Sequence, residues 1–350
     1  MLENTSVVIV TYNHKEYIEK CLDSIPSGLE VIVVDNISTD GTPELIEKKY
    51  GNVKLIRNNI NAGYGKGVNI GVQNSNKEYL VILNPDTIIE DNSIEKLINP
   101  LITNKNVVTV PKAVLYDGSA INTCGNIEHF TGLTFTRGLG ENINCFNEFE
   151  KLSGLSGLCF ALKKDIYYEI GGFDENIFLY MEDAELSWNI NSKNLEILYV
   201  PDSVIYHCYE FNLPAEKIYF VEKGRYIILR KYFNWKHYLL FLPSLILTEL
   251  LTFGYSILNG SDWIKFKLKG IRDGFRAPIE RVDCDRKQLF NALDSKLPEN
   301  ENLMNNNIKK IANLIYIINY ALIMGLWNLN IPKIKPLINT EIIGEKDDLD

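Results

Sequence analysis

Polar residues and glycines follow four apolar segments in the first third of the chain, at the points where those segments end. The clearest case is the segment 79–83, which stops at Asn84-Pro85-Asp86, although a buried strand has no structural need for a carboxylate there. One aspartate in such a place is most often a cap or a turn former. A series of such residues after successive segments fits a turn reading less well, and here the series is Thr11, Tyr12, Asn13, Asp35, Asn36, Asn58, Asn61, Gly63, Gly65, Gly67, Asn84 and Asp86.

The chemistry that these residue types favour is the binding of a divalent cation together with a phosphorylated ligand. Mg²⁺ prefers oxygen ligands and is commonly held by one or two carboxylates plus the phosphates of a substrate. Asp86 is placed to anchor such an ion, and Pro85 fixes its own φ and so helps to hold that carboxylate outward. The phosphates would belong to a nucleotide whose base and ribose lie near Thr11, Tyr12 and Asp35.

The elements that must position these residues alternate regularly over residues 6 to about 110. Short continuous apolar runs, such as 6–12 and 30–36, are typical of strands buried on both faces, and the segments between them have helical periodicity. This alternation predicts an α/β fold with a doubly wound, mostly parallel, Rossmann-like sheet. Because ligands of such sheets bind beyond the carboxyl ends of the strands, the polar residues are expected to converge.

Several classes of protein are disfavoured by composition and by motif placement. A dinucleotide-binding turn requires G-x-G-x-x-G after the first strand, but that place reads "TYNHKE", so NAD binding is not expected. The net charge of −9, with no long basic tract in the first half, argues against nucleic acid as a partner. The six cysteines form no C-x-x-C pair, and no signal peptide precedes the first strand, so we expect a cytoplasmic protein with free thiols.

The character of the chain changes near residue 235, which suggests a catalytic domain over 1–235 and a helical C-terminal region over 236–350. Segment 238–258 is long and apolar, a basic stretch follows at 263–287, and a second uncharged run spans 311–332. Segment 238–258 carries Glu249 near its middle and a polar residue at every fourth position: Ser244, Thr248, Thr252 and Ser256.

These features favour a helix that lies on a membrane surface over one that crosses it. A central acidic residue costs about 2.5–3.5 kcal/mol on insertion scales. An apolar face with a basic flank is typical of in-plane attachment to anionic lipid. For the second run, which contains Tyr316, Tyr320 and Trp327, a helix docked on the protein core is the alternative.

An ordered set of motifs resembles glycosyltransferase family 2, and within it the rhamnosyltransferase-like branch. The motifs are "VVIVTYN", "VIVVDNISTDGT", "NAGYGKGVNIG", "VILNPD", "IGGFDENIFLYMEDAELSW" and "VIYH", and they cover about residues 1–235 in the family's order. The resemblance implies a GT-A fold, a nucleotide-sugar donor, a divalent metal and inversion at the anomeric carbon.

The resemblance also assigns roles to individual residues. It implies a metal site with Asp86 and His207, although a strand-end histidine without a ligand is the alternative for His207. It implies Asp183 as the catalytic base, and Asp35 as a partner of the nucleotide base. The full nucleotide-binding set that we expect is Thr11, Tyr12, Asn13, Asp35, Asn61, Gly63 and Asn84, and the acceptor-side or supporting set is Glu182, Gly157 and Trp188.

Three positions depart from the family's pattern. Asn84 takes the place of the first aspartate of the D-x-D metal motif, which is common where the motif reads N-P-D. Glu185 takes the place of the last aspartate of E-D-x-D, and Asn189 stands where a basic residue often follows the tryptophan. Trp188 itself is expected to be either a core residue or a sugar platform.

The function expected from the sequence is therefore an inverting, metal-assisted hexosyltransferase. Its donor would be a UDP- or dTDP-linked sugar, with rhamnose as one candidate, its cofactor Mg²⁺ or Mn²⁺, and its acceptor a glycan or a lipid-linked glycan. We expect it at the inner face of the cell membrane, in cell-surface polysaccharide biosynthesis. The alternatives are another nucleotide-sugar or nucleotidyl transferase, or an inactive nucleotide-sugar-binding subunit.

Overall fold

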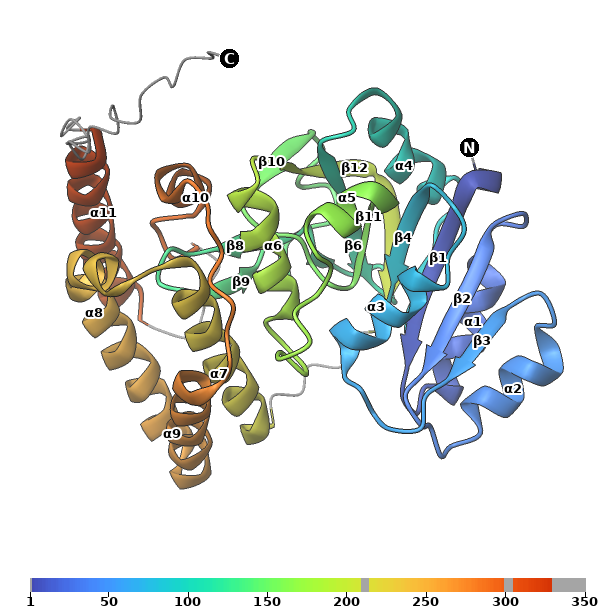
Figure 1. Ribbon diagram of the computed structural model, residues 1–350, viewed down its shortest axis with the longest axis horizontal. Helices are drawn as coiled ribbons and strands as arrows, with labels where there is room; N and C mark the ends of the chain where they lie inside the picture. Colours follow the sequence, from blue (N-terminus) through green and yellow to red (C-terminus); the bar gives the residue numbers. More distant parts are fainter. Residues whose placement is uncertain (1, 209–213, 299–304, 329–350) are drawn as a thin grey trace, which may run out of the picture.

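The computed structural model describes residues 2–208, 214–298 and 305–328 of the 350-residue chain. A ten-stranded sheet forms its centre, and a group of helices from the C-terminal part of the chain stands at one side of the sheet (Figure 1). The α/β architecture with a mainly parallel sheet and a helical C-terminal region, which the sequence predicts, is confirmed.

The N-terminal half of the sheet follows the predicted alternation of strands and helices. Its four strands stand side by side in the order β3-β2-β1-β4, and all three pairs are parallel. Parallel neighbours require crossover connections, and helices supply them. The elements are β1 (Thr5–Thr11), α1 (Lys15–Ser24), β2 (Glu30–Asp35), α2 (Thr42–Lys49), β3 (Lys54–Arg57), α3 (Tyr64–Gln73) and β4 (Tyr79–Leu83), preceded by a short 3₁₀ helix (Leu2–Asn4).

The second half of the sheet departs from the parallel pattern at β11 (Cys159–Lys163), which runs antiparallel between β4 and β6 (Val107–Leu115). β12 (Glu196–His207) then pairs in parallel with β6 and ends on the same side of the sheet as β1 and β4. The remaining elements are β5 (Thr87–Ile89), α4 (Ser93–Thr103), β7 (Ile121–Thr123), β8 (Asn126–Glu128), β9 (Thr134–Thr136), β10 (Glu150–Leu152), α5 (Lys164–Glu169) and α6 (Glu182–Ser192).

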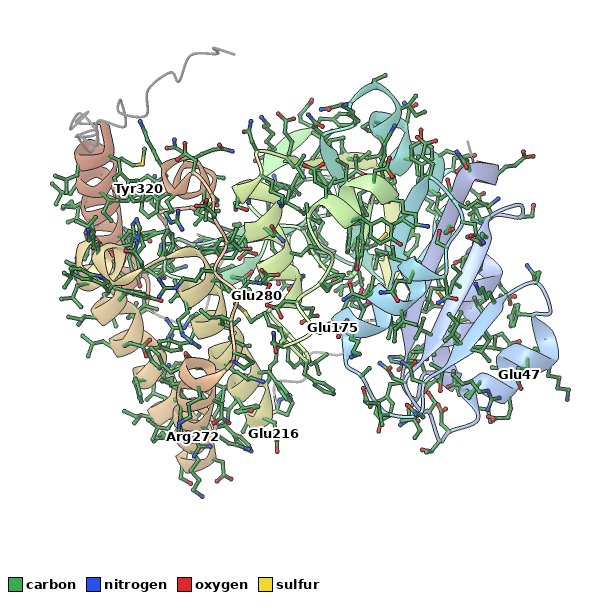
Figure 2. All side chains as sticks on the ribbon, viewed as in Figure 1. Glu47, Glu175, Glu216, Arg272, Glu280 and Tyr320 are labelled. Carbon is green, nitrogen blue, oxygen red and sulfur yellow. The ribbon has the colours of Figure 1, made fainter. Side chains whose placement is uncertain are left out.

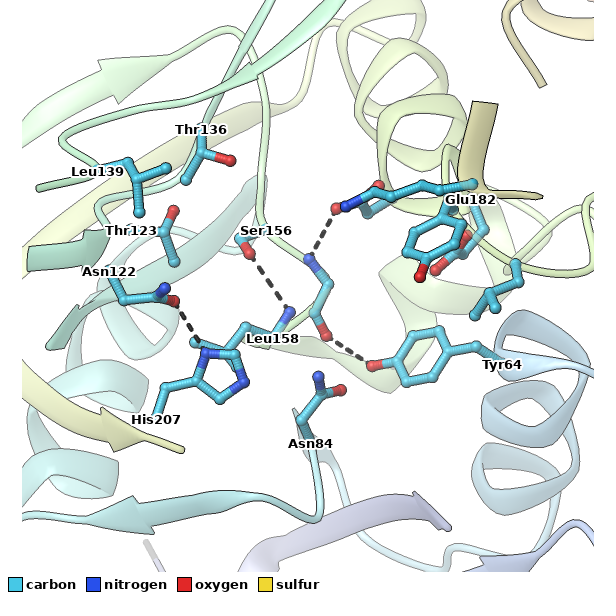
Figure 3. A pocket seen from close by; sticks show the side chains of 15 residues that line it. Tyr64, Asn84, Asn122, Thr123, Thr136, Leu139, Ser156, Leu158, Glu182 and His207 are labelled. Carbon is cyan, nitrogen blue, oxygen red and sulfur yellow. Dashed lines mark hydrogen bonds between the residues drawn. The ribbon is translucent and has the colours of Figure 1, made fainter. Parts of the chain in front are cut away.

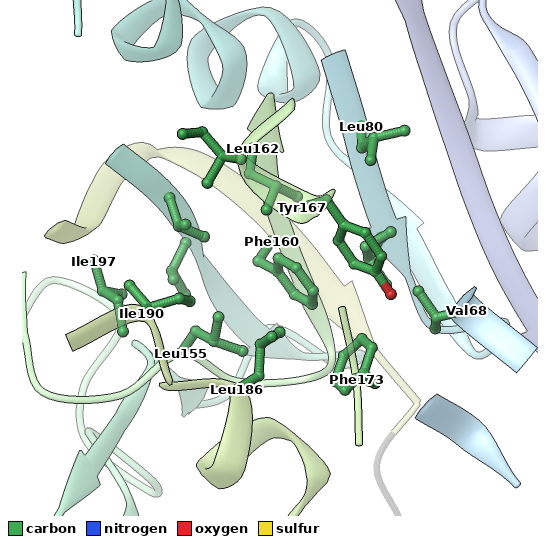
Figure 4. Close-up of a cluster of buried hydrophobic side chains, with 14 of the residues drawn as sticks. Val68, Leu80, Leu155, Phe160, Leu162, Tyr167, Phe173, Leu186, Ile190 and Ile197 are labelled. Carbon is green, nitrogen blue, oxygen red and sulfur yellow. The ribbon is translucent and has the colours of Figure 1, made fainter. Parts of the chain in front are cut away.

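Side chains of the central strands point alternately to two cores, one on each face of the sheet. Val8 and Val10 of β1 pack with α3, whereas Val7 and Ile9 pack with α1 on the opposite face. Figure 4 shows part of the first core around Phe160. Because both faces are covered, the strands are apolar throughout, which explains the continuous apolar runs in the sequence.

Two glycines let α3 come close to its neighbours. A Cβ atom at Gly67 would lie only 2.7 Å from Cγ1 of Val10 in β1, so the helix packs tightly because this position has no side chain. Gly63, just before the helix, has a φ of 83°, a left-handed conformation that favours glycine. These contacts place the first residue of α3, Tyr64, at the end of the sheet where the polar residues gather.

The C-terminal helices pack on the sheet domain through a shared apolar cluster. Phe130, in the β8–β9 turn, and Trp188 of α6 belong to the same buried cluster as residues of four C-terminal helices. The helices of this region are α7 (Ala215–Tyr232), α8 (Trp235–Asn259), α9 (Ser261–Arg276), α10 (Arg286–Ala292) and α11 (Asn306–Asn328). Residues 329–332 of the second uncharged run lie outside the described residues.

Two of these helices, α8 and α11, are long and apolar enough to cross a membrane by length and composition. Only about a fifth of the apolar window of each is buried inside the protein. Some core helices of soluble proteins are equally long and apolar. Which side chains of each helix face the protein therefore distinguishes a membrane helix from a core helix.

Candidate active site

A pocket of about 300 Å³ opens at the ends of the strands, where the sequence predicts a ligand site (Figure 3). Its wall combines segments that are far apart in the chain: the N-terminus of α3, the residues after β4, β7, the loop 156–158, the start of α6, the end of β12 and the first turn of α7. The lining residues include Tyr64, Asn84, Asn122, Gly157, Glu182, Asp183, His207 and Lys217.

Asp86 and His207 meet at one edge of this pocket. Nε2 of His207, the last residue of β12, lies 3.3 Å from Oδ2 of Asp86. Nδ1 of the same ring lies 2.9 Å from Oδ1 of Asn122 in β7, and this amide oxygen accepts a hydrogen bond from the ring N–H. This hydrogen bond orients the ring, and it turns Nε2 toward Asp86.

The carboxyl group of Asp86 is held in its ionised form. Burial opposes its ionisation, but the hydrogen bond and the charge of His207 outweigh that penalty and lower the pKa of Asp86 below its usual value. His14, at the start of α1, also contributes a favourable charge interaction. Because burial lowers the pKa of His14 itself, that second contribution is smaller at neutral pH.

These residues fit a divalent cation by the chemistry of their free atoms. Oδ1 of Asp86 and Oδ1 of Asn84 are buried and have no hydrogen-bond partner in the structure. A buried oxygen atom without a hydrogen-bond partner costs folding free energy unless a bound ligand or ion interacts with it. Among the described residues, no cluster of three or more His, Cys, Asp or Glu side chains surrounds a common point. A Mg²⁺ or Mn²⁺ ion here would therefore need oxygen atoms of a substrate as well.

Asp183 lies across the pocket, in the first turn of α6. Its Oδ2 atom accepts hydrogen bonds from the backbone N–H of Gly157 (3.0 Å) and from Nδ2 of Asn126 in β8 (3.1 Å). Its Oδ1 atom accepts from the N–H of Ala184 (2.9 Å). Gly157 is close because it has no side chain: a Cβ atom there would lie 3.3 Å from Cβ of Asp183. The carboxylate is thus fixed in one orientation.

The neighbouring Glu182 has a different electrostatic environment. It is buried, and its Oε2 atom has no hydrogen-bond partner. Burial, reinforced by the charge of Asp183, raises the pKa of Glu182 to about 8. Burial also raises the pKa of Asp183, but the hydrogen bonds from Gly157, Ala184 and Asn126 limit the rise. The hydrogen bonds therefore favour Asp183 over Glu182 as the ionised member of the pair.

Apart from Asn84, which lines the pocket, the residues predicted to bind the nucleotide lie next to it, at the ends of β1 and β2 and in the loop before α3. Asp35 accepts a hydrogen bond from the N–H of Ser38 through Oδ2, and its buried Oδ1 atom has no partner. His14 interacts with the charges of both Asp35 and Asp86, so the two strand ends lie close together. Tyr12 is half exposed beside them.

Three other members of this set organise the surrounding loops. Oδ1 of Asn13 accepts from the N–H of Thr39, and Oδ1 of Asn61 accepts from the N–H of Gly63. Thr11 is buried, with its hydroxyl 3.4 Å from Nδ1 of His14. These contacts give the strand ends a defined shape, while Asp35 keeps an unpaired buried oxygen and Tyr12 and Asn13 remain exposed.

Trp188 lies in the core and not in the pocket. It is fully buried, and its indole N–H donates to Oε2 of Glu128 in β8, two residues from Asn126. Of the two possibilities left open by the sequence, the core position is the one observed. Its contact with the Asn126 strand makes it a supporting residue behind Asp183.

Glu185, the residue that departs from E-D-x-D, has a partner on α7. Its Oε1 atom lies 2.6 Å from Nζ of Lys231 and accepts from the hydroxyl of Tyr232 at 2.9 Å. Lys231 also pairs with Asp174 at 2.7 Å. Glu185 is therefore committed to holding α6 against α7 and is not available to the pocket.

The sequence reasoning missed four residues of the site: Tyr64, Asn122, Asn126 and Lys217. The hydroxyl of Tyr64 donates to the carbonyl of Gly157 (2.6 Å), which fixes the loop that in turn holds Asp183. Lys217 lies in the first turn of α7, where its charge acts on Asp183. Asn122 and Asn126 belong to a stretch rich in Gly, Asn and Thr without clear periodicity, so no sequence signal distinguished them.

Comparisons with known proteins agree with this geometry. Residues 6–171 match the family model "Glycosyl transferase family 2". The chain is 27% identical over 263 residues to the N-acetylglucosaminyl-diphospho-decaprenol L-rhamnosyltransferase of Mycobacterium tuberculosis, a match that covers 65% of this chain and 85% of that relative.

Two solved structures share the fold. TarS 1–349 of S. aureus in complex with UDP has a TM-score of 0.53 and 19% identity, and the match covers 93% of this chain and 91% of TarS 1–349. GalNAc-T7 with UDP, GalNAc and Mn²⁺ has a TM-score of 0.54 and 17% identity, and the match covers 78% of this chain and 54% of GalNAc-T7. At these identities the likeness shows a common fold.

Proposed function

Since the chain belongs to glycosyltransferase family 2, we propose that it moves a sugar from a nucleoside-diphosphate donor to a hydroxyl of a glycan or lipid-linked acceptor, with inversion at the anomeric carbon. The observation that supports this proposal most strongly is that one pocket has a carboxylate suited to a base on one side and potential metal ligands on the other. An ionised, fixed carboxylate, Asp183, lies on one side, and Asn84 and His207, next to Asp86, lie on the other.

On the donor side, Asp86 and His207 would hold Mg²⁺ or Mn²⁺, with the diphosphate of the donor as further ligands. The unpaired Oδ1 atoms of Asp86 and Asn84 support this assignment. Such an ion, when bound, neutralises the diphosphate and makes it a better leaving group. Asp35, with its free Oδ1 atom, would accept a hydrogen bond from the nucleotide base, and Thr11, Tyr12, Asn13, Asn61 and Gly63 would shape the nucleotide site.

On the acceptor side, Asp183 would act as the general base. The acceptor hydroxyl oxygen forms a bond to the anomeric carbon as the bond from that carbon to the diphosphate oxygen breaks, and the electron pair leaves with the diphosphate. Asp183 takes the hydroxyl proton, which requires its ionised form. Gly157 and Glu182 would line the acceptor site, and Trp188 would support it from the core.

The substrates that we propose follow from the relatives. The donor is UDP- or dTDP-linked, because the TarS structure holds UDP and the mycobacterial relative is named a rhamnosyltransferase. The acceptor is a lipid-linked glycan of the cell surface, since the same relative is named for a diphospho-decaprenol acceptor. An enzyme with such an acceptor works at the inner face of the cell membrane.

A panel of nucleotide sugars tests the proposal directly. The purified full chain, incubated with UDP- and dTDP-sugars, should release nucleoside diphosphate only when Mg²⁺ or Mn²⁺ is present, and a chelator should stop the reaction. Hydrolysis of the donor by water is a sufficient readout without the acceptor. Tight binding of a nucleotide sugar with no turnover under any condition would instead indicate an inactive binding subunit. Turnover that is equally fast without the metal would contradict the role of Asp86.

The hydrogen bond from Asn126 predicts a change in pH dependence. Activity should fall as pH decreases through the pKa of Asp183, because the protonated carboxyl group is no base. Asn126→Ala removes a donor that favours the ionised form, so the pKa of Asp183 rises further and the acid limb of kcat/KM moves to higher pH. A purely structural role for Asn126 would lower the rate by the same factor at every pH, and that profile would contradict the prediction.

A further inference from the structure

The long helices α8 and α11 turn polar side chains toward the protein, while many of their apolar side chains lie on the outside. On α8, the buried positions include Ser244, Thr248 and Ser256, three residues of the stripe noted in the sequence. A helix on the surface of a soluble protein shows the opposite arrangement, with its apolar stripe facing the core.

Hydrogen bonds between the two helices satisfy the polar groups that face inward. The hydroxyl of Ser244 donates to Oδ1 of Asn319 on α11 (2.6 Å), and the amide of Asn319 donates back to the carbonyl of Leu240 (2.9 Å). The hydroxyls of Thr248 and Tyr316 lie 2.8 Å apart. The inner faces are therefore paired with each other, and their polarity does not require water.

Glu249, the acidic residue in the middle of the apolar segment, also turns inward. It forms an ion pair with Arg225 of α7, accepts a hydrogen bond from the hydroxyl of Tyr226 (2.7 Å), and lies 3.4 Å from Nζ of Lys267 on α9. Burial opposes the ionisation of Glu249, but the charge of Arg225 outweighs it and holds the pKa of Glu249 below its usual value. The negative charge of Glu249, which is costly in an apolar environment, is thus compensated by basic residues of the protein.

The outward surface of the two helices is correspondingly apolar. Leu250 is 67% exposed on α8, and Leu322 is 61% exposed on α11. We call this surface the apolar face; its members are Leu239, Leu242, Ile246, Leu250, Ile257 and Leu258 of α8 with Ile311, Leu314, Ile318, Leu322 and Leu326 of α11. Apolar surface of this extent is unusual on a soluble monomer and marks an interaction site.

The chemistry next to the apolar face indicates what covers it. Helix α9 contacts α8, and its exposed residues mix the apolar Leu268 and Phe275 with basic side chains. Arg272, which pairs with Asp273 at 2.9 Å, is one of them (Figure 2). The other exposed basic residues of this helix are Lys265, Lys269 and Arg276. Apolar surface flanked by basic residues matches an anionic membrane, whereas a second copy of this chain would bring like charges together.

We propose that the apolar face of α8 and α11 is seated in one leaflet of an anionic phospholipid membrane, with the basic residues of α9 at the lipid headgroups. The helices lie in the membrane plane, because the inner side of α8 is joined to charged groups of α7 and α9 and cannot face lipid. This membrane contact would bring the active site to a lipid-linked acceptor in the same membrane. Only that biological reason for the contact rests on the proposed function.

Flotation of the full chain with vesicles tests this surface. Wild-type protein should float with vesicles that contain phosphatidylglycerol and less with purely zwitterionic ones. The double variant Ile246→Glu/Leu250→Glu should lose at least about tenfold in binding, because two apolar side chains leave the lipid and two charges replace them. Lys269→Gln/Arg276→Gln should lower binding to the anionic vesicles alone, by about fivefold for each charge.

Matched controls separate this surface from folding and from catalysis. Ile102→Glu/Tyr168→Glu introduces the same charges at exposed apolar positions of α4 and α5 and should float as the wild type does. All variants should hydrolyse a soluble nucleotide sugar as the wild type does, so that a failure of the proposed function appears as lost hydrolysis with flotation unchanged.

Three outcomes would overturn the proposal. The first is equal flotation of the apolar-face variant and the wild type. The second is a wild-type dimer in light scattering that the same variant dissociates, without vesicle binding by either, which would make a second copy the occupant. The third is wild-type protein that resists alkaline extraction from the vesicles, which would indicate that the helices cross the membrane.

Discussion

Replacing Asp183 by asparagine is expected to lower sugar transfer by at least about 10², while donor and metal affinity stay within a few-fold of wild type. Asparagine preserves the size of the side chain and the oxygen that accepts from Gly157 or Ala184, so the loop 156–158 should keep its position. It removes the ionised carboxylate that accepts the acceptor proton. The loss should therefore appear in kcat, measured by single-turnover transfer, and not in calorimetric affinity for the donor.

The neighbouring Glu182 provides the comparison for this variant. Because its pKa is about 8, Glu182 carries a proton at neutral pH, and Glu182→Gln resembles that form. We expect Glu182→Gln to lose much less transfer than Asp183→Asn at pH 7. If the two variants lose transfer equally, or if Asp183→Asn loses donor binding in parallel with activity, Asp183 does not act as the base.

Replacing Asp86 by alanine is expected to abolish the part of donor affinity that depends on Mg²⁺ or Mn²⁺. The variant removes the carboxylate that contacts His207, and with it a buried Oδ1 atom that has no hydrogen-bond partner among the described residues. Even removing a residue that only orients a metal ligand typically costs 10–100-fold in metal affinity, so loss of the carboxylate itself should cost at least about as much. Calorimetric titration of UDP- or dTDP-sugar with and without the metal measures the effect.

An aspartate outside the pocket serves as the control. Asp91 lies on the exposed loop between β5 and α4, and Asp91→Ala should leave metal-dependent affinity unchanged. Thermal unfolding of both variants should resemble that of the wild type, which shows that the sheet is intact. Unchanged metal-dependent affinity in Asp86→Ala would remove this residue from the site.

Much of the fold and part of the site follow from local patterns. The continuous apolar runs predict strands buried on both faces, and the placement of Asn84 and Asp86 after such a run predicts the edge where they gather. The antiparallel direction of β11 could not be predicted, because the direction in which a strand enters a sheet depends on its partners β4 and β6, and not on its own residues. The order of the strands in the second half of the sheet likewise depends on which strands pair with each other, and not on the residues of each strand alone.

The supporting residues of the site illustrate the same limit. Asn126 and Asn122 belong to short strands in a stretch without periodicity, and each matters because of one hydrogen bond to a residue more than fifty positions away. Such a bond exists only once the strand ends have been brought together. Asp183 and Gly157 were recognisable from the family motifs, whereas the donor Asn126 was not.

Helix α8 shows most clearly what the sequence alone determined and what the tertiary structure decided. Helical periodicity is local, so the sequence by itself determined that Ser244, Thr248, Thr252 and Ser256 form one stripe and that Glu249 lies next to it. Whether that stripe faces lipid, water or protein depends on groups distant in the chain. Arg225 and Lys267, from α7 and α9, turn Glu249 inward, and Asn319 of α11 pairs with Ser244. Because buried charges and hydroxyls must find partners, these contacts leave the apolar side of the helix outside.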